Sequence, residues 1–308
     1  MKKMLSVLLL VIASLSATPV VADVTSWPQK EVTIVVPFPP GGTVDRIARQ
    51  LAIDLPTILK KPVVVKNVPG ANSVIAMREV TRLDPDHTFI ISLINIVSTQ
   101  ISMDSDLYQK FQPVMVVGSS QSMVFKNNAA TVASITESIK NKKGIAVAIP
   151  DLIDNGGMWV DRLDGFNAEV IPFKGAAQMI SGVMQGEPAL GVCSVFCMWP
   201  WVSQRQLEPL FVAGDKRNPF LPNTPSAKEF GLKSDRFNYD SVYIISSTTS
   251  IDPAVAEKFN NVLKFVATNN AQIQGYGKIG MEIKLLPVKQ SKKVWDDAVE
   301  MSKNYFKK

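Results

Sequence analysis

Short apolar runs rich in β-branched residues alternate with longer amphipathic stretches along most of the 308-residue chain. Such apolar runs are typical of buried strands, whereas apolar positions three or four residues apart indicate helices. The predicted strands are 32–36, 63–66, 88–92, 114–117, 123–125, 145–148, 169–171, 190–193, 210–213 and 241–246. The clearest predicted helices are 43–59, 73–81, 135–140, 175–185, 253–268 and 289–304. This alternation predicts an α/β fold with largely parallel sheets.

The number of strands predicts two lobes that exchange strands. Ten strands are too many for one small sheet, yet no Ser/Gly-rich linker divides the chain. We therefore expect the chain to leave the first lobe near Phe125 and to return through 241–246. The predicted division is 23–125 plus 239–308 for lobe 1 and 126–238 for lobe 2.

The first residues predict export. Lys2 and Lys3 precede an apolar run from Met4 to about Leu15, and small residues follow at 20–22. This order is typical of a secretory signal peptide, here cleaved after Ala22, and it predicts a periplasmic protein. A membrane-anchoring N-terminal helix is the alternative, but the apolar run is short for spanning a bilayer.

Charge and motifs argue against several functional classes. The formal net charge is +6, with the charges scattered along the chain, and no basic block with interleaved aromatics indicates nucleic-acid binding. His87 is the sole histidine and lies in a polar turn, and the chain lacks nucleophile-elbow, phosphate-loop and zinc-protease motifs. Metal ligation also lacks clustered His and Cys. We therefore expect a protein that is not an enzyme and has no metal site.

The most informative segment joins a predicted strand to a predicted helix. The strand 32–36 ends at a proline-rich turn, and Gly41-Gly42 then opens directly into the helix that begins at Thr43. Free N–H groups and the positive end of a helix attract anions, and a glycine pair lets a ligand approach the backbone. The segment therefore predicts an anion-binding site, with a plain tight turn as the alternative.

Two later turns could face that site from the second lobe. Asn155, Gly156 and Gly157 follow the strand 145–148, although Asn-Gly turns are also common punctuation. Lys174 lies in a turn between a strand and a helix and is the best-placed cation for a carboxylate. An ordinary solvated surface lysine is the alternative for Lys174.

Cys193 and Cys197 are the only cysteines in the chain. In an oxidising compartment they could form a small disulfide loop at the end of a second-lobe strand. Two buried free thiols remain the alternative, because sequence does not give the distance between the Cα atoms.

Taken together, these segments resemble the substrate-binding receptors of tripartite tricarboxylate transporters, also called Bug-type receptors. The resemblance covers almost the whole chain after residue 22, and the first two long segments in combination are the most specific. The segments that carry it are Trp27-Pro28, 36–46, 64–72, 172–175 and 222–231.

The resemblance implies a two-lobed periplasmic-binding-protein fold, often called a flytrap, that closes around a small organic acid. It also implies delivery of that acid to the permease subunits of a membrane transporter, and no cofactor. We expect the receptor to be a monomer. A ligand-sensing adaptor of the same fold, which signals to a membrane sensor, is the alternative. The lobe 1 residues that the resemblance places at the ligand are Phe38, Pro39, Gly41, Gly42, Thr43, Asp45, Asn72, Ser92 and Asn95.

Overall fold

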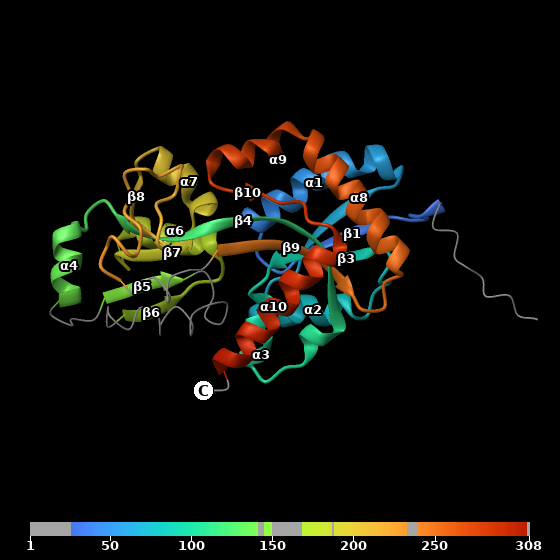
Figure 1. Cartoon of the computed structure of the whole chain (residues 1–308), viewed down its shortest axis with the longest axis horizontal. Coiled ribbons are helices and arrows are strands. Elements are labelled where there is room, and N and C mark those ends of the chain that lie inside the picture. Colours follow the sequence, from blue (N-terminus) through green and yellow to red (C-terminus); the bar gives the residue numbers. More distant parts are fainter. Residues whose placement is uncertain (1–25, 141–144, 150–167, 187, 233–239, 307–308) are drawn as a thin grey trace, which may run out of the picture.

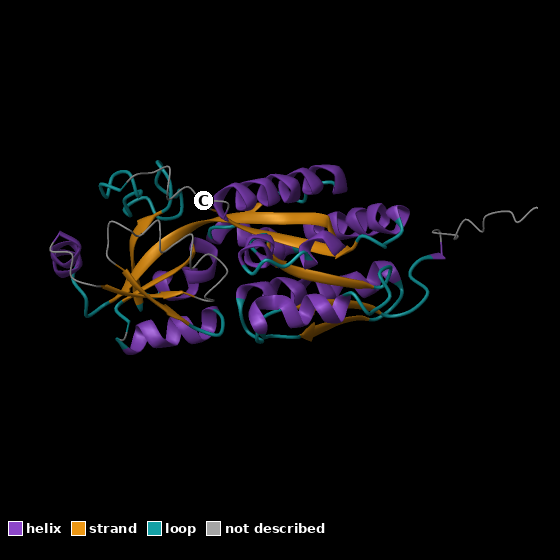
Figure 2. Cartoon of the chain, turned by 90° about the horizontal axis from the view of Figure 1, so that it is seen from below, coloured by secondary structure: helices purple, strands orange, loops and turns teal. Residues whose placement is uncertain are grey.

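The computed structural model describes residues 26–140, 145–149, 168–186, 188–232 and 240–306. These residues form a mixed α/β fold in two lobes (Figure 1). Ten described strands form one hydrogen-bonded network, which bends between the lobes (Figure 2). The two-lobed α/β prediction is therefore confirmed.

The first lobe is built on a mixed sheet. β1 (Val32–Val36) pairs in parallel with both β2 (Val63–Asn67) and β3 (Thr88–Leu93). β9 (Asp240–Thr248) then runs antiparallel to β3, and the short β10 (Glu282–Ile283) joins at another edge. Parallel pairing places the ends of β1 and β3 at the same edge, from which their loops reach toward the second lobe.

The second lobe repeats this arrangement on a smaller scale. β5 (Ile145–Ile149) pairs in parallel with β6 (Ala168–Pro172) and with β7 (Leu190–Ser194). β8 (Leu207–Val212) belongs to the same sheet but is antiparallel to its neighbour. The parallel strands again deliver their connecting loops to one edge.

The strand β4 (Phe111–Asn127) joins the two sheets. Its first part pairs with β9, and its last residues pair with β7 and β8, always antiparallel. The sequence prediction of two separate strands here is therefore wrong, as is that of largely parallel sheets. Small polar residues at 118–122 interrupt the apolar run, yet the backbone ladder continues through them. Ser120 is buried and donates to the carbonyl oxygen of Gly280 at 2.6 Å.

Helices cover both faces of each sheet. Along β1 the side chains of Val32, Ile34 and Val36 join the core beneath α1 and α8, whereas Val35 joins the opposite core with α2, α3 and α10. Two smaller cores flank the second sheet. The longer helices are α1 (Thr43–Leu59), α4 (Val132–Lys140), α6 (Ala176–Gln185), α7 (Val195–Ser203), α8 (Pro253–Asn269) and α10 (Val288–Phe306).

The sequence predicted most of the helices within about three residues, but it missed several shorter elements. The shorter helices are α2 (Val74–Val80), α3 (Ile96–Ser102) and α9 (Ala271–Tyr276). Of these, α3 and α9 were not predicted, nor were α7 and β10. No helix within the described ranges combines the length and the apolar character that crossing a bilayer requires.

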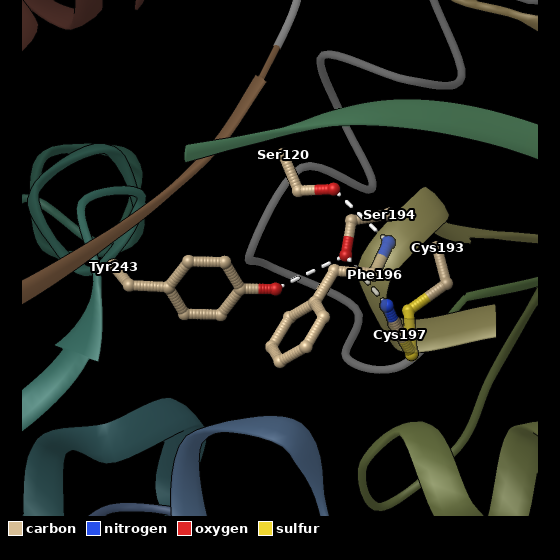
Figure 3. The surroundings of a disulfide bond; sticks show 6 residues. All are labelled: Ser120, Cys193, Ser194, Phe196, Cys197 and Tyr243. Atoms are coloured by element: carbon tan, nitrogen blue, oxygen red, sulfur yellow. Dashed lines mark hydrogen bonds between the residues drawn. A yellow bond between two sulfur atoms is a disulfide. The ribbon is translucent and has the colours of Figure 1, made fainter. Parts of the chain in front are cut away.

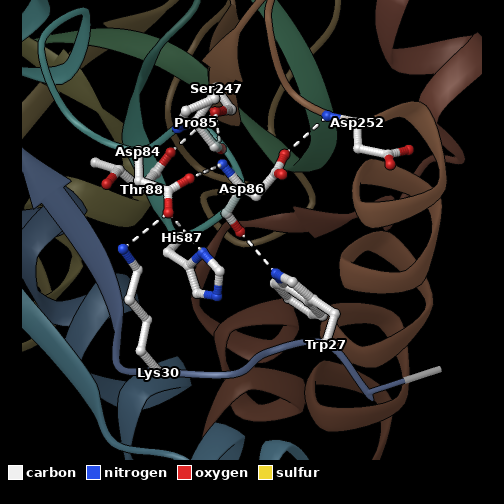
Figure 4. A network of polar contacts seen from close by, with 9 residues as sticks. All are labelled: Trp27, Lys30, Asp84, Pro85, Asp86, His87, Thr88, Ser247 and Asp252. Carbon is white, nitrogen blue, oxygen red and sulfur yellow. Dashed lines mark hydrogen bonds and ion pairs between the residues drawn. The ribbon is translucent and has the colours of Figure 1, made fainter. Parts of the chain in front are cut away.

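A polar network fixes the start of the described chain to the first sheet (Figure 4). The Trp27 indole donates to the carbonyl oxygen of Asp86 at 2.8 Å, while the Asp86 carboxylate accepts from the backbone N–H of Asp252. His87 is buried, and its Nδ1 lies 3.1 Å from the Asp84 carboxylate. His87 thus has the structural turn role that its sequence context predicted.

The exchange of strands through β4 and β9 agrees with the predicted return of the chain to the first lobe. The boundaries at residues 125–126 and 238–239 stay a prediction, because β4 belongs to both sheets and the second boundary lies next to residues outside the described part.

Candidate functional site

A cavity of about 290 Å³ lies between the lobes. The first lobe contributes the loop after β1, the first turn of α1 and residues of β3 and β9. The second lobe contributes the ends of β5 and β7 and the first turns of α6 and α7. The lining residues are Phe38, Pro39, Pro40, Gly42, Thr43, Val44, Leu93, Asn95, Ser122, Ile149, Lys174, Gly175, Ala176, Ala177, Gln178, Val192, Cys193, Ser194, Cys197, Ser241 and Tyr243.

The first turn of α1 presents unpaired backbone donors to this cavity. Gly42 is the N-cap residue, and no side chain caps the helix. The first hydrogen bond inside α1 runs from the Arg46 N–H to the Gly42 oxygen. The N–H groups of Thr43 and Val44 therefore have no acceptor within the helix, and both residues line the cavity.

The loop in front of α1 is held by Asp45 rather than by a ligand. The Asp45 carboxylate is buried and accepts from the Gly41 N–H at 2.9 Å, from Arg49 at 2.9 Å and from Asn67 at 2.8 Å. Asn67 also donates to the Phe38 carbonyl oxygen. Burial alone would raise the pKa of Asp45, but these hydrogen bonds and the charge of Arg49 hold that pKa below its usual value. Asp45 thus stays ionised and fixes the loop.

The first turn of α6 repeats the geometry on the opposite lobe. Its N-cap residue is Gly175, again without a side-chain cap, and the first intrahelical bond is donated by Met179. The N–H groups of Ala176, Ala177 and Gln178 have no acceptor within the helix, and all three residues line the cavity. Two helix N-termini, one from each lobe, therefore offer free donors to the same space.

The N-terminus of α7 differs, because its donors are already satisfied (Figure 3). The Ser194 hydroxyl accepts from the Cys197 N–H at 3.2 Å, and the Ser120 hydroxyl accepts from the Phe196 N–H at 3.0 Å. Ser194 Oγ also lies 3.0 Å from the Tyr243 hydroxyl. Burial raises the pKa of Tyr243 to about 12, so this part of the lining is hydroxyl-rich and uncharged at neutral pH.

The two cysteines form a disulfide in the wall of the cavity (Figure 3). Cys193 lies near the end of β7 and Cys197 lies in the first turn of α7, with their Cα atoms 6.2 Å apart. The bridge therefore ties the strand to the helix that follows it. Its sulfurs add apolar surface to the lining.

Among the residues that the sequence singled out, some lie at the cavity and others do not. Phe38, Pro39, Gly42, Thr43, Asn95 and Lys174 line it. Gly41, Asp45, Asn72 and Ser92 do not line it, and Asp45 and Gly41 instead bond to each other. Asn155, Gly156 and Gly157 lie outside the described residues.

The sequence prediction missed several lining residues. It named Lys174 but not the three residues that follow Gly175, although the strand–glycine–helix pattern at 172–176 matches that at 36–43. Ser122, Ser194 and Tyr243 gave no signal of their own, because single hydroxyl residues in strands are common. In the described part of the chain, no group of three or more His, Cys, Asp or Glu could hold a metal ion.

The sequence model of the family described as "Tripartite tricarboxylate transporter family receptor" matches residues 47–308. The chain belongs to this family. The family is a class of solute-binding receptors and not a class of enzymes. Protein BugT of Bordetella pertussis (strain Tohama I) is 24% identical over 294 residues, covering 91% of this chain and 89% of BugT.

Solved structures share the fold. The periplasmic binding protein BugD superposes with a TM-score of 0.80 at 22% identity, covering 91% of this chain and 98% of BugD. A protein from R. palustris with adipate gives a TM-score of 0.79, also at 22% identity, covering 90% of this chain and 96% of that protein. At these identities the likeness concerns the fold alone, and the fold is that of two-lobed periplasmic binding proteins.

Proposed function

We propose that this receptor binds a small organic carboxylate between its lobes and delivers it to a tripartite tricarboxylate-type membrane permease. The observation that carries the proposal is the pair of uncapped helix N-termini, α1 and α6, that line one cavity from opposite lobes. Their free N–H groups and positive helix ends favour an anion. A carboxylate that accepts from both helices would also hold the lobes together.

The energies of such contacts agree with useful affinity. Micromolar binding corresponds to about −8 kcal/mol. A helix end contributes only about 0.3–1 kcal/mol, or about 2 when partly buried. Three or four charge-assisted hydrogen bonds of about 1.5–3 kcal/mol each bring the total into range before ordering costs are subtracted. Backbone donors therefore carry much of the binding.

Membership of the family supports the transport role, because these receptors serve membrane transporters. The similar R. palustris protein was solved with adipate, which also agrees with a carboxylate ligand here. The proposed route to the periplasm is the signal peptide, with mature protein that begins at Asp23. Mass spectrometry of the exported protein tests this, since an intact or lipid-modified N-terminus would contradict it.

A thermal-shift screen against a library of carboxylates tests the binding function. A ligand at one hundred times its dissociation constant stabilises the folded state by about 2.7 kcal/mol. We expect at least one small carboxylate to raise the melting temperature and the matching primary amide or alcohol to have no effect. If no carboxylate stabilises the protein while an uncharged or cationic solute does, the proposed function is wrong.

A further inference from the structure

The described lining of the cavity between the lobes carries little charge of its own. Among its described lining residues, Lys174 is the one with a charged side chain, and it is exposed at the rim. The backbone donors of α1 and α6 are the other anion-binding groups of the described lining. Together these groups suit one carboxylate.

The other described lining residues are apolar or neutral. Phe38, Leu93, Ile149 and Val192 contribute apolar side chains, and the disulfide contributes its sulfurs. The strands that cross between the lobes supply hydroxyl groups, including those of Ser122 and Tyr243. The N–H groups of α7 do not supplement them, because Ser194 and Ser120 already accept from those donors.

A further cation, Arg46, lies outside the described lining. Arg46 lies one turn into α1, and its guanidinium carbon is 5.6 Å from the centre of the Phe196 ring. Its Nε is buried without a hydrogen-bond partner in the described structure. The charge of Arg46 partly offsets the effect of burial on the pKa of Tyr243, which lines the cavity. Arg46 itself packs on the Phe196 ring and is not among the described lining residues.

We propose that the ligand is a monocarboxylate with an apolar body, rather than a dicarboxylate or tricarboxylate. This inference rests on the proposed carboxylate-binding function and names the ligand class of the same site. The carboxylate is held between the ends of α1 and α6. The body of the ligand packs against the apolar wall, and any further polar group is neutral and bonds to the hydroxyls on β4 and β9.

Desolvation is the physical reason for this preference. A second carboxylate would leave water and meet apolar groups or neutral hydroxyls, which compensate a buried charge poorly. An apolar group at the same position gains from leaving water. Removing one negative charge from a ligand of similar shape should therefore strengthen its binding.

Calorimetry with matched ligands tests this. The probes are butyrate with succinate, hexanoate with adipate, and benzoate with terephthalate, together with monomethyl adipate, at pH 7.5 and 0.15 M salt. We expect the monoanion of at least one pair to bind at least tenfold more tightly than its dianion. We also expect monomethyl adipate to bind more tightly than adipate.

A charge introduced into the wall should reverse the preference. Ser241 lies in the lining and is half-buried, which gives a longer side chain room to reach the cavity. We expect Ser241→Arg to shift the ratio of dianion to monoanion affinity at least tenfold toward the dianion. The uncharged Ser241→Gln adds length without the charge and should not shift the ratio toward the dianion. Thermal melting of both variants checks folding.

The outcomes separate the two proposals. Tighter binding of a dianion by the wild-type protein would overturn the monocarboxylate inference and leave the carboxylate-receptor function standing. If Arg46→Gln then abolished that binding, Arg46 would be the partner of the second carboxylate. If no probe bound, and the carboxylate library of the thermal-shift screen also gave no ligand, the receptor function itself would fail and the inference with it.

Discussion

The two helix ends that meet at the cavity are built from the same pattern but are supported differently. At α1 the preceding loop is fixed by the buried Asp45 carboxylate, which accepts hydrogen bonds from the Gly41 N–H, Arg49 and Asn67. At α6 the preceding turn has Gly175 at φ +91° and an exposed lysine, and the described residues place no such carboxylate there. The α1 end is therefore preorganised by a charge of its own, whereas the α6 end depends mainly on backbone conformation.

The two ends are also close enough to limit each other. A Cβ built on Gly175 would lie 3.5 Å from Cδ of Pro39, which belongs to the loop before α1. The turn before α6 therefore lies close to the α1 loop that Asp45 fixes. We infer that the α1 end of the site is held more firmly than the α6 end, and three variants test this difference.

The largest effect is expected for Gly42→Val. Gly42 has φ −73° and ψ 173°, an extended conformation that any residue adopts, and a Cβ there meets only the Pro39 carbonyl oxygen at 3.9 Å. The added side chain would occupy the space beside the Thr43 and Val44 donors. We expect at least a hundredfold loss of affinity, about 2.7 kcal/mol, measured by calorimetry with a ligand from the screen.

The fold should survive this change, because replacing glycine by valine at the N-cap destabilises a helix by only about 1 kcal/mol. Gly275→Val is the matched control, since a Cβ there also meets open space and Gly275 lies in α9, outside the cavity lining. Normal binding by Gly42→Val would show that the backbone of α1 does not hold the ligand.

The second effect concerns the support of the α1 loop. In Asp45→Asn an amide NH₂ replaces either the oxygen that accepts from both Gly41 and Arg49 or the oxygen that accepts from Asn67. A charge-assisted bond is then lost, and donors face each other. We expect a loss of about 1.5–3 kcal/mol in the free energy of unfolding and weaker binding. Asp297→Asn, which removes an exposed ion pair with Lys293 on α10, should change stability little.

The same variant predicts a pH dependence. The pKa of Asp45 is lowered in the folded state from an ordinary value of 3.8. The stabilisation is therefore complete above the unfolded pKa and is lost as the pH falls through the folded pKa. Denaturant unfolding at pH 7 and in acid should show the gap between wild type and Asp45→Asn closing below about pH 4. A gap independent of pH would indicate that the carboxylate charge is not the cause.

The smallest effect is expected for Lys174→Ala. Lys174 is exposed at the rim, where water and salt screen its charge. We expect less than about a fivefold loss of affinity, and the loss should shrink further in 0.5 M salt. Lys228→Ala, an exposed lysine outside the lining, is the control. Complete loss of binding in Lys174→Ala would make a side-chain salt bridge, rather than the backbone donors, the main anchor.

The fold could be predicted largely from apolar periodicity, because segments such as 32–36 and 43–59 show the spacing of apolar residues that is typical of a buried strand and of a helix. The prediction failed where the buried residues are polar. Ser119, Ser120 and Ser122 are buried within β4, yet local sequence makes them resemble a turn. The hydroxyls of Ser119 and Ser120 bond to Glu282 and Gly280, which lie far along the chain, and no local pattern reveals such partners.

The candidate site could be predicted only in part for a related reason. The glycine pair at Gly41-Gly42 signals a helix end that accepts anions, and the structure places Gly42 and Thr43 at the cavity. The direction of the Asp45 side chain could not be predicted from the sequence, because it depends on a hydrogen bond from Asn67 in β2. Tyr243 meets Ser194 only because β9 and β7 both flank β4.

The long strand β4 also limits where a gene for such a receptor can be divided into fragments that encode single lobes. Its early residues, including Val114 and Met115, complete the first hydrophobic core, and its later residues, including Val124 and Phe125, complete the cores of the other lobe. A fragment that encodes one lobe would therefore either lack a central strand or carry half of one with its hydrogen bonds open to any partner. Neither lobe is complete without this strand. Recombination between the genes of related receptors therefore has to exchange both lobes together or repack the strand that they share.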